Sequence, residues 1–383
     1  MASQKPIYLD YNATTPILKQ VAEAMLPFLY EHYGNPSSSY RYGVQARQAV
    51  DQARQQVAEA INAQADEIIF TSGGTESNNL ALRGYALAHQ ENGRHIITSV
   101  IEHPAILEVC RYLETIGFHV TYLPVDQYGC VNPSDLERSI RPETILVSIM
   151  HANNEVGTIQ PLVELVKITH TAGAVFHTDA AQSMGKIPVN IQDLGVDLLS
   201  IAGHKLYAPK GVGALFIRQG VKLDNILFGA DQEHGLRPGT ENVMQIVGLG
   251  QAVQEATENL QKNIEHFLNL RDRLYHGLKN TLSAQNIRLN GHPQDRLPNT
   301  LNVSFKGIEA NTLLALIRSS IAASAGAACH SGEVSISNVI TAMKVPMEWA
   351  KGTVRFSVGR MTTRNEIDQA IYILDEAYKS IMQ

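Results

Sequence analysis

The chain has 383 residues, which is enough for two domains or for one large domain with an appendage. Its hydrophobic fraction of 44% and charged fraction of 18% are ordinary for a soluble globular protein, and the net charge of −6 gives no reason to expect a nucleic-acid partner. No run of about 18 or more apolar residues occurs and the N-terminus lacks the apolar region of a signal peptide, so no membrane partner is expected. Three cysteines in so long a chain favour a reducing compartment, which we expect to be cytoplasmic.

Predicted strands and helices alternate through more than half of the chain. A short strand and turn (7–16) leads into a helical segment interrupted at Pro27, and a long amphipathic helix runs from about Val44 to Ile61. The strands that follow are predicted at 67–70, 95–100, 118–125, 144–150, 174–180 and 197–202. This rhythm predicts a mostly parallel α/β sheet.

The pattern changes after the strand that ends at Ala202. A second apolar run follows Gly211, and residues 229–242 form a loop without clear periodicity. A helical segment from about Met244 to Leu282 resembles a connector between domains. The remainder mixes short strands with helices, as in α+β folds, and its last helix begins with a capping box from Thr363 to Glu366.

Side chains that could bind a ligand or take part in catalysis follow the ends of five predicted strands. They are Thr75, His103, Asn154, Asp179 and Lys205. Each of them alone has an ordinary structural explanation. Ligands of open α/β sheets bind outside the carboxyl ends of the strands, however, so five such residues together point to one site. Thr75 follows two glycines at a helix N-terminus, which suits a phosphate but matches neither a Walker A motif nor GxGxxG.

The pair of Lys205 and Asp179 indicates a Schiff-base cofactor. A lysine at the end of a buried strand becomes nucleophilic if desolvation lowers its pKa. Pyridoxal phosphate needs such a lysine for its imine and an acid that keeps its ring nitrogen protonated. Gln182 could reach the phenolate oxygen of the cofactor, and Asn154 could donate to the same oxygen or to a substrate carboxylate.

Two further residues lie in the C-terminal part of the chain. Cys329 lies among small residues (324–332), where an accessible thiol could act as a nucleophile or sulfur carrier. Cys110 is predicted to be a buried helix residue and Cys130 a turn residue. Arg355 could clamp a substrate carboxylate, and we expect Arg360 to form a surface ion pair.

Several motifs together resemble the cysteine desulfurase family, in the class V aminotransferase group of fold-type I pyridoxal phosphate enzymes. The resemblance covers nearly the whole chain in order, through YLDYNATTP, GNPSS, FTSGGTESNN, EH (102–103), NNEVGTIQP, HTDAAQ, GHKLYAPKG, RPGTEN and VRFSVGR. It implies an α/β fold with a large domain (16–258) built on a seven-stranded, mainly parallel sheet. A smaller α+β domain would combine residues 1–15 and 259–383 and carry the Cys329 loop, and the protein would be a homodimer.

The resemblance also implies a role for each site residue. Lys205 would be the Schiff-base lysine, Asp179 the partner of the pyridine nitrogen and Gln182 that of the phenolate oxygen, with His103 stacked on the ring and shuttling a proton. Gly74, Thr75 and His204 would hold the phosphate, together with Thr240 of the other subunit. Asn154 and Arg355 would bind the substrate carboxylate. Cys329 would carry the persulfide. No metal site is expected.

The implied reaction converts L-cysteine to L-alanine and leaves a persulfide on Cys329, which passes to an acceptor such as an Fe–S scaffold protein. Two departures matter. Ala202 stands where many desulfurases carry a phosphate-binding serine, and GAACHS around Cys329 resembles the loop of selenocysteine lyases. A selenocysteine lyase acting on L-selenocysteine is therefore the alternative, followed by a simple aminotransferase and by a non-enzymatic scaffold.

Overall fold

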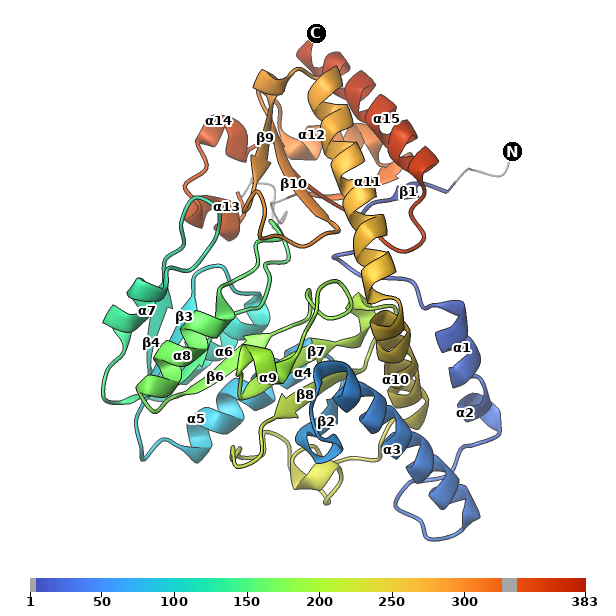
Figure 1. Cartoon of the computed structure of the whole chain (residues 1–383), viewed down its shortest axis with the longest axis vertical. Coiled ribbons are helices and arrows are strands. Elements are labelled where there is room, and N and C mark those ends of the chain that lie inside the picture. Colours follow the sequence, from blue (N-terminus) through green and yellow to red (C-terminus); the bar gives the residue numbers. More distant parts are fainter. Residues whose placement is uncertain (1–4, 326–335) are drawn as a thin grey trace.

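The computed structural model describes residues 5–325 and 336–383 (Figure 1). A seven-stranded sheet forms the centre of its larger body. Its strands are β2 (Ile68–Thr71), β3 (His95–Ser99), β4 (His119–Leu123), β5 (Thr144–Ser148), β6 (Val175–Asp179), β7 (Leu198–Ala202) and β8 (Gly213–Ile217). They lie in the order β2-β8-β7-β6-β5-β3-β4, with every neighbouring pair parallel except the two that involve β8. The predicted seven-stranded, mainly parallel α/β sheet is therefore confirmed.

Helices cover both faces of this sheet. They are α3 (Arg41–Ile61), α4 (Gly74–Asn79), α5 (Tyr85–Ala88), α6 (Pro104–Thr115), α7 (Pro133–Ser139), α8 (Leu162–Thr171), α9 (Ile191–Leu194) and α10 (Val243–Glu258), with α1 (Lys19–Met25) and α2 (Pro27–Tyr30) outside α10. Two separate clusters of buried apolar residues lie against the sheet, as two covered faces require. Asn132 caps α7 by accepting a hydrogen bond from the backbone of Ser134, as its position before Pro133 predicts.

A smaller sheet forms the other body. Its order is β12 (Ser324–Ala325), β13 (Thr353–Ser357), β10 (Thr300–Phe305) and β9 (Ile287–Asn290), all antiparallel, and β1 (Ile7–Tyr8) pairs separately with β11 (Ile321–Ala322). The helices here are α11 (Leu260–Thr281), α12 (Ala310–Ile317), α13 (Asn338–Ala342), α14 (Met347–Ala350) and α15 (Arg364–Met382). A hydrophobic core of its own joins this sheet to α11, α12 and α15.

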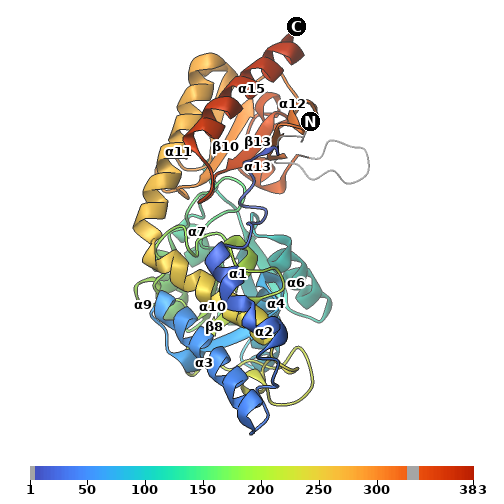
Figure 2. The same ribbon diagram turned by 90° about the vertical axis from the view of Figure 1, so that its right-hand side faces the viewer.

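Helix α11 links the two bodies. Figures 1 and 2 show it leaving the end of α10 and running along the smaller sheet beside α15. The chain enters the smaller body first through β1, then builds the larger body and returns through α11. The domain boundaries at residues 15/16 and 258/259 stay a prediction: Ile7 and Leu9 belong to the apolar core of the smaller body, whereas Tyr11 belongs to that of the larger body.

Some elements differ from the predicted ones. The predicted helix from Met244 to Leu282 is broken at Asn259, whose φ of −107° and ψ of 11° turn the chain between α10 and α11. Helix α4 continues into α5 through a π-helical turn (Leu80–Gly84), which the apolar periodicity does not reveal. The break at Pro27 and the capping box of Thr363 and Glu366 are confirmed. In the described part of the chain, no helix combines the length and apolar character that a membrane crossing requires.

Candidate active site

A cavity of about 350 Å³ opens at the carboxyl ends of the parallel strands, where the two bodies meet. It falls in the range of roughly 300–1,000 Å³ that small-molecule sites occupy. Most of the predicted site residues line it, namely Gly74, Thr75, His103, Asn154, Asp179, Gln182, His204, Lys205 and Arg355. The five residues that the strand-end rule brings together, Thr75, His103, Asn154, Asp179 and Lys205, therefore lie in one cavity, although their individual roles stay predictions.

Lys205 lies in a 3₁₀ turn (Gly203–Lys205) directly after β7. Its Nζ donates to the backbone carbonyl oxygens of Asn12 (2.6 Å) and Ala13 (2.8 Å). Burial lowers the pKa of this amine to about 8; the nearby Arg355 lowers it too, while two carboxylates oppose the shift. More of Lys205 is therefore neutral near physiological pH than in an ordinary lysine, and the neutral amine is the nucleophilic form.

Asp179 ends β6 and is buried beside the cavity. Its Oδ2 accepts a hydrogen bond from Nδ2 of Asn78 at 2.8 Å, and its Oδ1 accepts one from the backbone N–H of Ala181 at 2.9 Å. These donors fix the plane of the carboxylate. Asn78 belongs to the FTSGGTESNN motif, but the sequence alone predicted no role for it.

The turn between β2 and α4 forms one end of the cavity. Gly73 has a φ of +147°, which side chains rarely adopt, and a Cβ on Gly74 would lie 3.2 Å from Cβ of Ala202. The N-terminal amides of α4 and the side chain of Thr75 face this end, and so does His204, whose Nδ1 lies 3.1 Å from Oγ1 of Thr14. Burial, followed by the neighbouring Lys205, lowers the pKa of His204 to about 4, so its ring is neutral. A helix N-terminus with a close-approaching backbone suits a phosphate.

His103 is the N-cap of α6 and lines the cavity. Its Nδ1 accepts a hydrogen bond from the backbone N–H of Ala105 at 3.1 Å. That contact requires Nδ1 without a proton, so the neutral ring carries its proton on Nε2. Desolvation lowers the pKa of His103; Asp179 opposes this shift and Lys205 adds to it. The ring can therefore donate or accept a single proton at Nε2.

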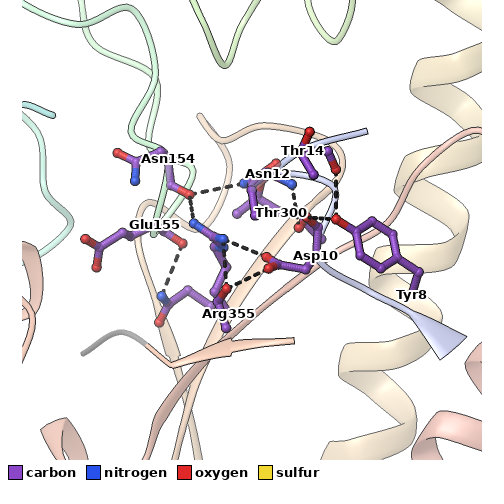
Figure 3. A network of polar contacts seen from close by, with 12 residues as sticks. Tyr8, Asp10, Asn12, Thr14, Asn154, Glu155, Thr300 and Arg355 are labelled. Carbon is purple, nitrogen blue, oxygen red and sulfur yellow. Dashed lines mark hydrogen bonds and ion pairs between the residues drawn. The ribbon is translucent and has the colours of Figure 1, made fainter. Parts of the chain in front are cut away.

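Arg355 projects from β13 of the smaller body into a polar network (Figure 3). Its Nη2 bonds to Oδ1 of Asp10 at 2.6 Å and to Oγ of Ser324 at 3.2 Å, and its Nη1 donates to the backbone oxygen of Asn154 at 3.0 Å. Its Nε is buried without a partner among the described residues. The sequence predicted Arg355 but missed Asp10, because a carboxylate two residues past a short strand gives no signal of its partner.

Asn12 is the second residue that the sequence did not single out. Its backbone oxygen accepts from Nζ of Lys205 and, at 3.0 Å, from Nε2 of Gln182. Its Nδ2 donates to Oγ1 of Thr300 at 2.8 Å and to the backbone oxygen of Asn154 at 3.2 Å. Asn12 thus ties the N-terminal segment to both bodies at the cavity (Figure 3). Its place in the YLDYNATTP motif was the available signal.

The two remaining predicted site residues are Thr240 and Cys329. Thr240 is exposed in the loop before α10 and does not line the cavity of its own chain. Cys329 lies outside the described residues. Cys110 is buried in α6, as predicted, with its pKa raised to about 12 by burial; burial also raises the pKa of Cys130 to about 11.

The prediction that Arg360 forms a surface ion pair is wrong. Among the described residues no carboxylate lies within ion-pair distance of it. Its half-buried guanidinium donates to the backbone oxygen of Glu255 at 3.1 Å, in the last turn of α10, and lies over the ring of Tyr207 at 5.1 Å. Arg360 therefore neutralises a helix C-terminus instead of a carboxylate.

Comparison with known proteins shows the family to which the chain belongs. Residues 7–370 match the aminotransferase class-V family. The cysteine desulfurase IscS of Dictyoglomus turgidum is 48% identical over 379 residues, covering 99% of this chain and 96% of that protein, and the IscS of Methanosarcina thermophila is 48% identical, covering 98% and 93%. A solved NifS-like protein superposes with a TM-score of 0.91 at 39% identity, covering 98% of this chain and 99% of that one. A structure described as SspA in complex with cysteine gives 0.79 at 35%, covering 93% and 100%. The chain therefore belongs to the aminotransferase class-V family and, within it, to the cysteine desulfurases.

Proposed function

We propose that this protein is a pyridoxal phosphate-dependent cysteine desulfurase that converts L-cysteine to L-alanine and accepts the sulfur on Cys329. One observation carries the proposal: a half-buried lysine, Lys205, with a pKa of about 8 shares a cavity with the Asp179 carboxylate and the Arg355 guanidinium. The relatives that match over nearly the full chain bear the same activity in their names.

The residues of the cavity fit the cofactor. Lys205 offers an amine for its aldehyde, and the acceptor-only carboxylate of Asp179 suits a protonated ring nitrogen. At the other end, the glycine turn and the N-terminus of α4 leave room that a Cβ on Gly74 would fill, next to Thr75 and His204. Ala202 supplies no hydroxyl there, so these groups carry the phosphate contacts.

When bound, pyridoxal phosphate supplies an electron sink for the electrons released at the substrate Cα. The residues of the chain bind and move protons around that reaction. Arg355 and Asn154 bind the carboxylate of cysteine, which requires Arg355 to turn N–H groups from the protein oxygens toward the substrate. Lys205 takes up the Cα proton on its amine, and Nε2 of His103 exchanges a proton with the substrate thiol.

The role of Cys329 in sulfur transfer is proposed from the sequence, because Cys329 lies outside the described residues. The Cys329 thiolate forms a bond to the substrate sulfur while the carbon–sulfur bond breaks, and its electron pair leaves with the alanine fragment, which is then protonated. Ser324, five positions earlier in the chain, donates to Oδ2 of Asp10 at 2.8 Å at the edge of the cavity. The persulfide passes to an acceptor protein, for which an Fe–S scaffold in the cytoplasm is our candidate.

We also propose a homodimer in which Thr240 completes the phosphate site of the other subunit. Large apolar side chains are exposed from α2 to the start of α3 and in the loop after β8, among them Leu29, Tyr30, Tyr33, Tyr40, Tyr42 and Phe228. Phe228 is 91% exposed. An apolar surface of this kind favours a protein interface. Light scattering on the purified protein tests the dimer, and a monomer would contradict it.

The activity test compares two substrates and two variants. Alanine is measured from L-cysteine and from L-selenocysteine for the parent protein, Cys329→Ala and Lys205→Ala. A desulfurase requires that the parent consumes cysteine and that both variants lose this activity. Strong preference for selenocysteine, or selenocysteine cleavage that survives in Cys329→Ala, favours the selenocysteine lyase. A requirement for a 2-oxo acid would favour a simple aminotransferase.

A further inference from the structure

A buried lysine, Lys186, lies next to the cavity and has no carboxylate partner among the described residues. Only 5% of Lys186 is exposed, and no described ion pair includes it. Its Nζ donates to Oε1 of Gln182 at 2.6 Å and approaches Oδ1 of Asn12 at 3.3 Å. A buried amine of this kind costs free energy, because lysine is rarely buried without a charged partner. Its two neutral partners are both residues of the cavity, which suggests that the cost is tolerated for the site.

The backbone holds Lys186 where it reaches Gln182. The two residues stand four positions apart in helical turns after β6, in which the N–H of Lys186 bonds to the carbonyl of Ser183. Gly185 between them has a φ of +74°, and a Cβ there would lie 3.0 Å from Cβ of Ala256. The glycine therefore lets this segment pack against α10 and directs Lys186 inward.

Lys186 and a backbone carbonyl together fix the orientation of the Gln182 amide. Nε2 of Gln182 donates to the backbone oxygen of Asn12 at 3.0 Å, and that oxygen can only accept. Oε1 of Gln182 therefore faces Lys186, which donates. The same carbonyl of Asn12 accepts from Lys205, so the second N–H of Gln182 stays available next to the reactive amine. If Lys186 were lost, Oε1 would be buried without a donor and the amide would gain freedom to rotate.

The contact of Lys186 with Asn12 is not needed to orient the Asn12 side chain. Oδ1 of Asn12 also accepts from Nδ2 of Asn299 at 2.9 Å, a shorter contact than the one from Lys186. Nδ2 of Asn12 is held by Thr300 and Asn154. Asn12 therefore keeps its orientation without Lys186, whereas Oε1 of Gln182 has Lys186 as its one donor among the described residues.

We propose that Lys186 is a positioning residue that orients the Gln182 amide so that its free N–H donates to the phenolate oxygen of bound pyridoxal phosphate. This inference rests on the proposed function, because it assumes that the cavity takes that cofactor. Lys186 touches neither substrate nor cofactor and acts through Gln182.

The test is a double-mutant cycle on cofactor affinity. Apo-protein is titrated with pyridoxal phosphate for the parent, Lys186→Met, Gln182→Met and the double variant. Methionine is unbranched and flexible, so it fills the space of the lysine stem without a donor. We expect Lys186→Met to raise the Kd about tenfold in the parent, as loss of one buried hydrogen bond does, and less than about twofold in the Gln182→Met background.

The spectrum of the loaded protein gives a second readout, since a donor on the phenolate oxygen changes the visible absorption of the cofactor. Lys186→Met should shift the absorption maximum in the same direction as Gln182→Met, and Lys186→Gln, which keeps an N–H donor, should recover most of the affinity. The exposed Lys167 supplies the matched control: Lys167→Met should leave Kd and spectrum unchanged.

Three outcomes overturn the proposal. They are an unchanged Kd in Lys186→Met, an equal loss in both backgrounds, and misfolding of both Lys186→Met and Lys186→Gln, which would assign Lys186 to the fold. Failure of the proposed function is seen separately, in a parent protein that binds no cofactor or forms no alanine from cysteine.

Discussion

Asp10 and Arg355 form a largely buried ion pair, with Oδ1 of Asp10 2.6 Å from Nη2 of Arg355, although 345 positions separate them in the chain. The pair joins the segment after β1 to the middle of β13, at the wall of the cavity (Figure 3). Burial makes such a pair costly to break on one side only, because the remaining charge is left without compensation. The N-terminal segment is therefore tied to the active site and cannot be a dispensable extension.

The first prediction concerns this pair. Asp10→Asn keeps a hydrogen-bond acceptor but leaves the Arg355 charge uncompensated, and we expect it to lower the free energy of unfolding by about 2–4 kcal/mol. Urea denaturation of the apo-protein measures this. Asp368→Asn breaks the exposed pair of Asp368 and Arg273 and serves as the matched control, for which little change is expected. Equal effects of the two substitutions would contradict the burial argument.

The second prediction concerns the pH dependence that Lys205 contributes. The folded apo-protein holds the pKa of Lys205 at about 8, below the ordinary 10.5. Between these values the unfolded chain binds more protons than the folded one, so this contribution to stability increases as pH rises from 8 toward 10.5. Below pH 8 the burial penalty on the charged amine is fully present.

Comparison of the parent with Lys205→Met isolates this effect, because the other titrating groups remain in both proteins. The parent should gain stability relative to the variant between pH 8 and pH 10, in urea titrations of the apo-proteins. The exposed Lys167→Met provides the reference for a lysine outside the cavity. A difference between parent and Lys205→Met that stays constant over this interval would show that Lys205 is not desolvated.

The third prediction separates the three cysteines. Burial raises the pKa of Cys110 to about 12 and that of Cys130 to about 11, so neither supplies thiolate near neutral pH. Cys110→Ala and Cys130→Ser should therefore retain cysteine desulfuration, while Cys329→Ala should lose at least about 100-fold because no thiolate attacks the substrate sulfur. Alanine formation under single-turnover conditions decides this, with cofactor content checked in each variant. Loss of activity in Cys130→Ser would move the sulfur-accepting role away from Cys329.

The sequence predicted the large sheet well because each of its strands is a short segment rich in apolar and β-branched residues that is followed by a polar or glycine-containing turn. The strand-end residues could be placed together for the same reason, since parallel strands present their carboxyl ends at one edge. Thr75, Asp179 and Lys205 are therefore in one cavity as predicted.

Contacts between distant segments could not be predicted in this way. The ion pair of Asp10 with Arg355 and the contacts of Asn12 with Lys205 and Gln182 depend on how β1 and β13 meet the larger body. Periodicity reports the burial of a residue but not its partner. Lys186 shows the same limit: the sequence alone did not single it out, and only the three-dimensional structure shows that it is buried.

The last prediction concerns Ala202, which stands where many desulfurases have a serine. Ala202 is buried at the end of the cavity that the turn between β2 and α4 forms, and its Cβ faces the space next to Gly74. Ala202→Ser adds a hydroxyl donor at this end and should lower the Kd for pyridoxal phosphate by up to about tenfold. Gly74→Ala should raise this Kd, because the added Cβ would lie 3.2 Å from Cβ of Ala202 and narrow the space between the two residues.

Titration of the three apo-proteins with inorganic phosphate as well as with pyridoxal phosphate locates both effects. If the phosphate group of the cofactor binds at this end, the two substitutions should shift the affinities for both ligands in the same order, tightest for Ala202→Ser and weakest for Gly74→Ala. An unchanged affinity in Gly74→Ala would mean that the cofactor phosphate binds elsewhere in the cavity, and the contacts assigned to Thr75 and His204 would then be wrong as well.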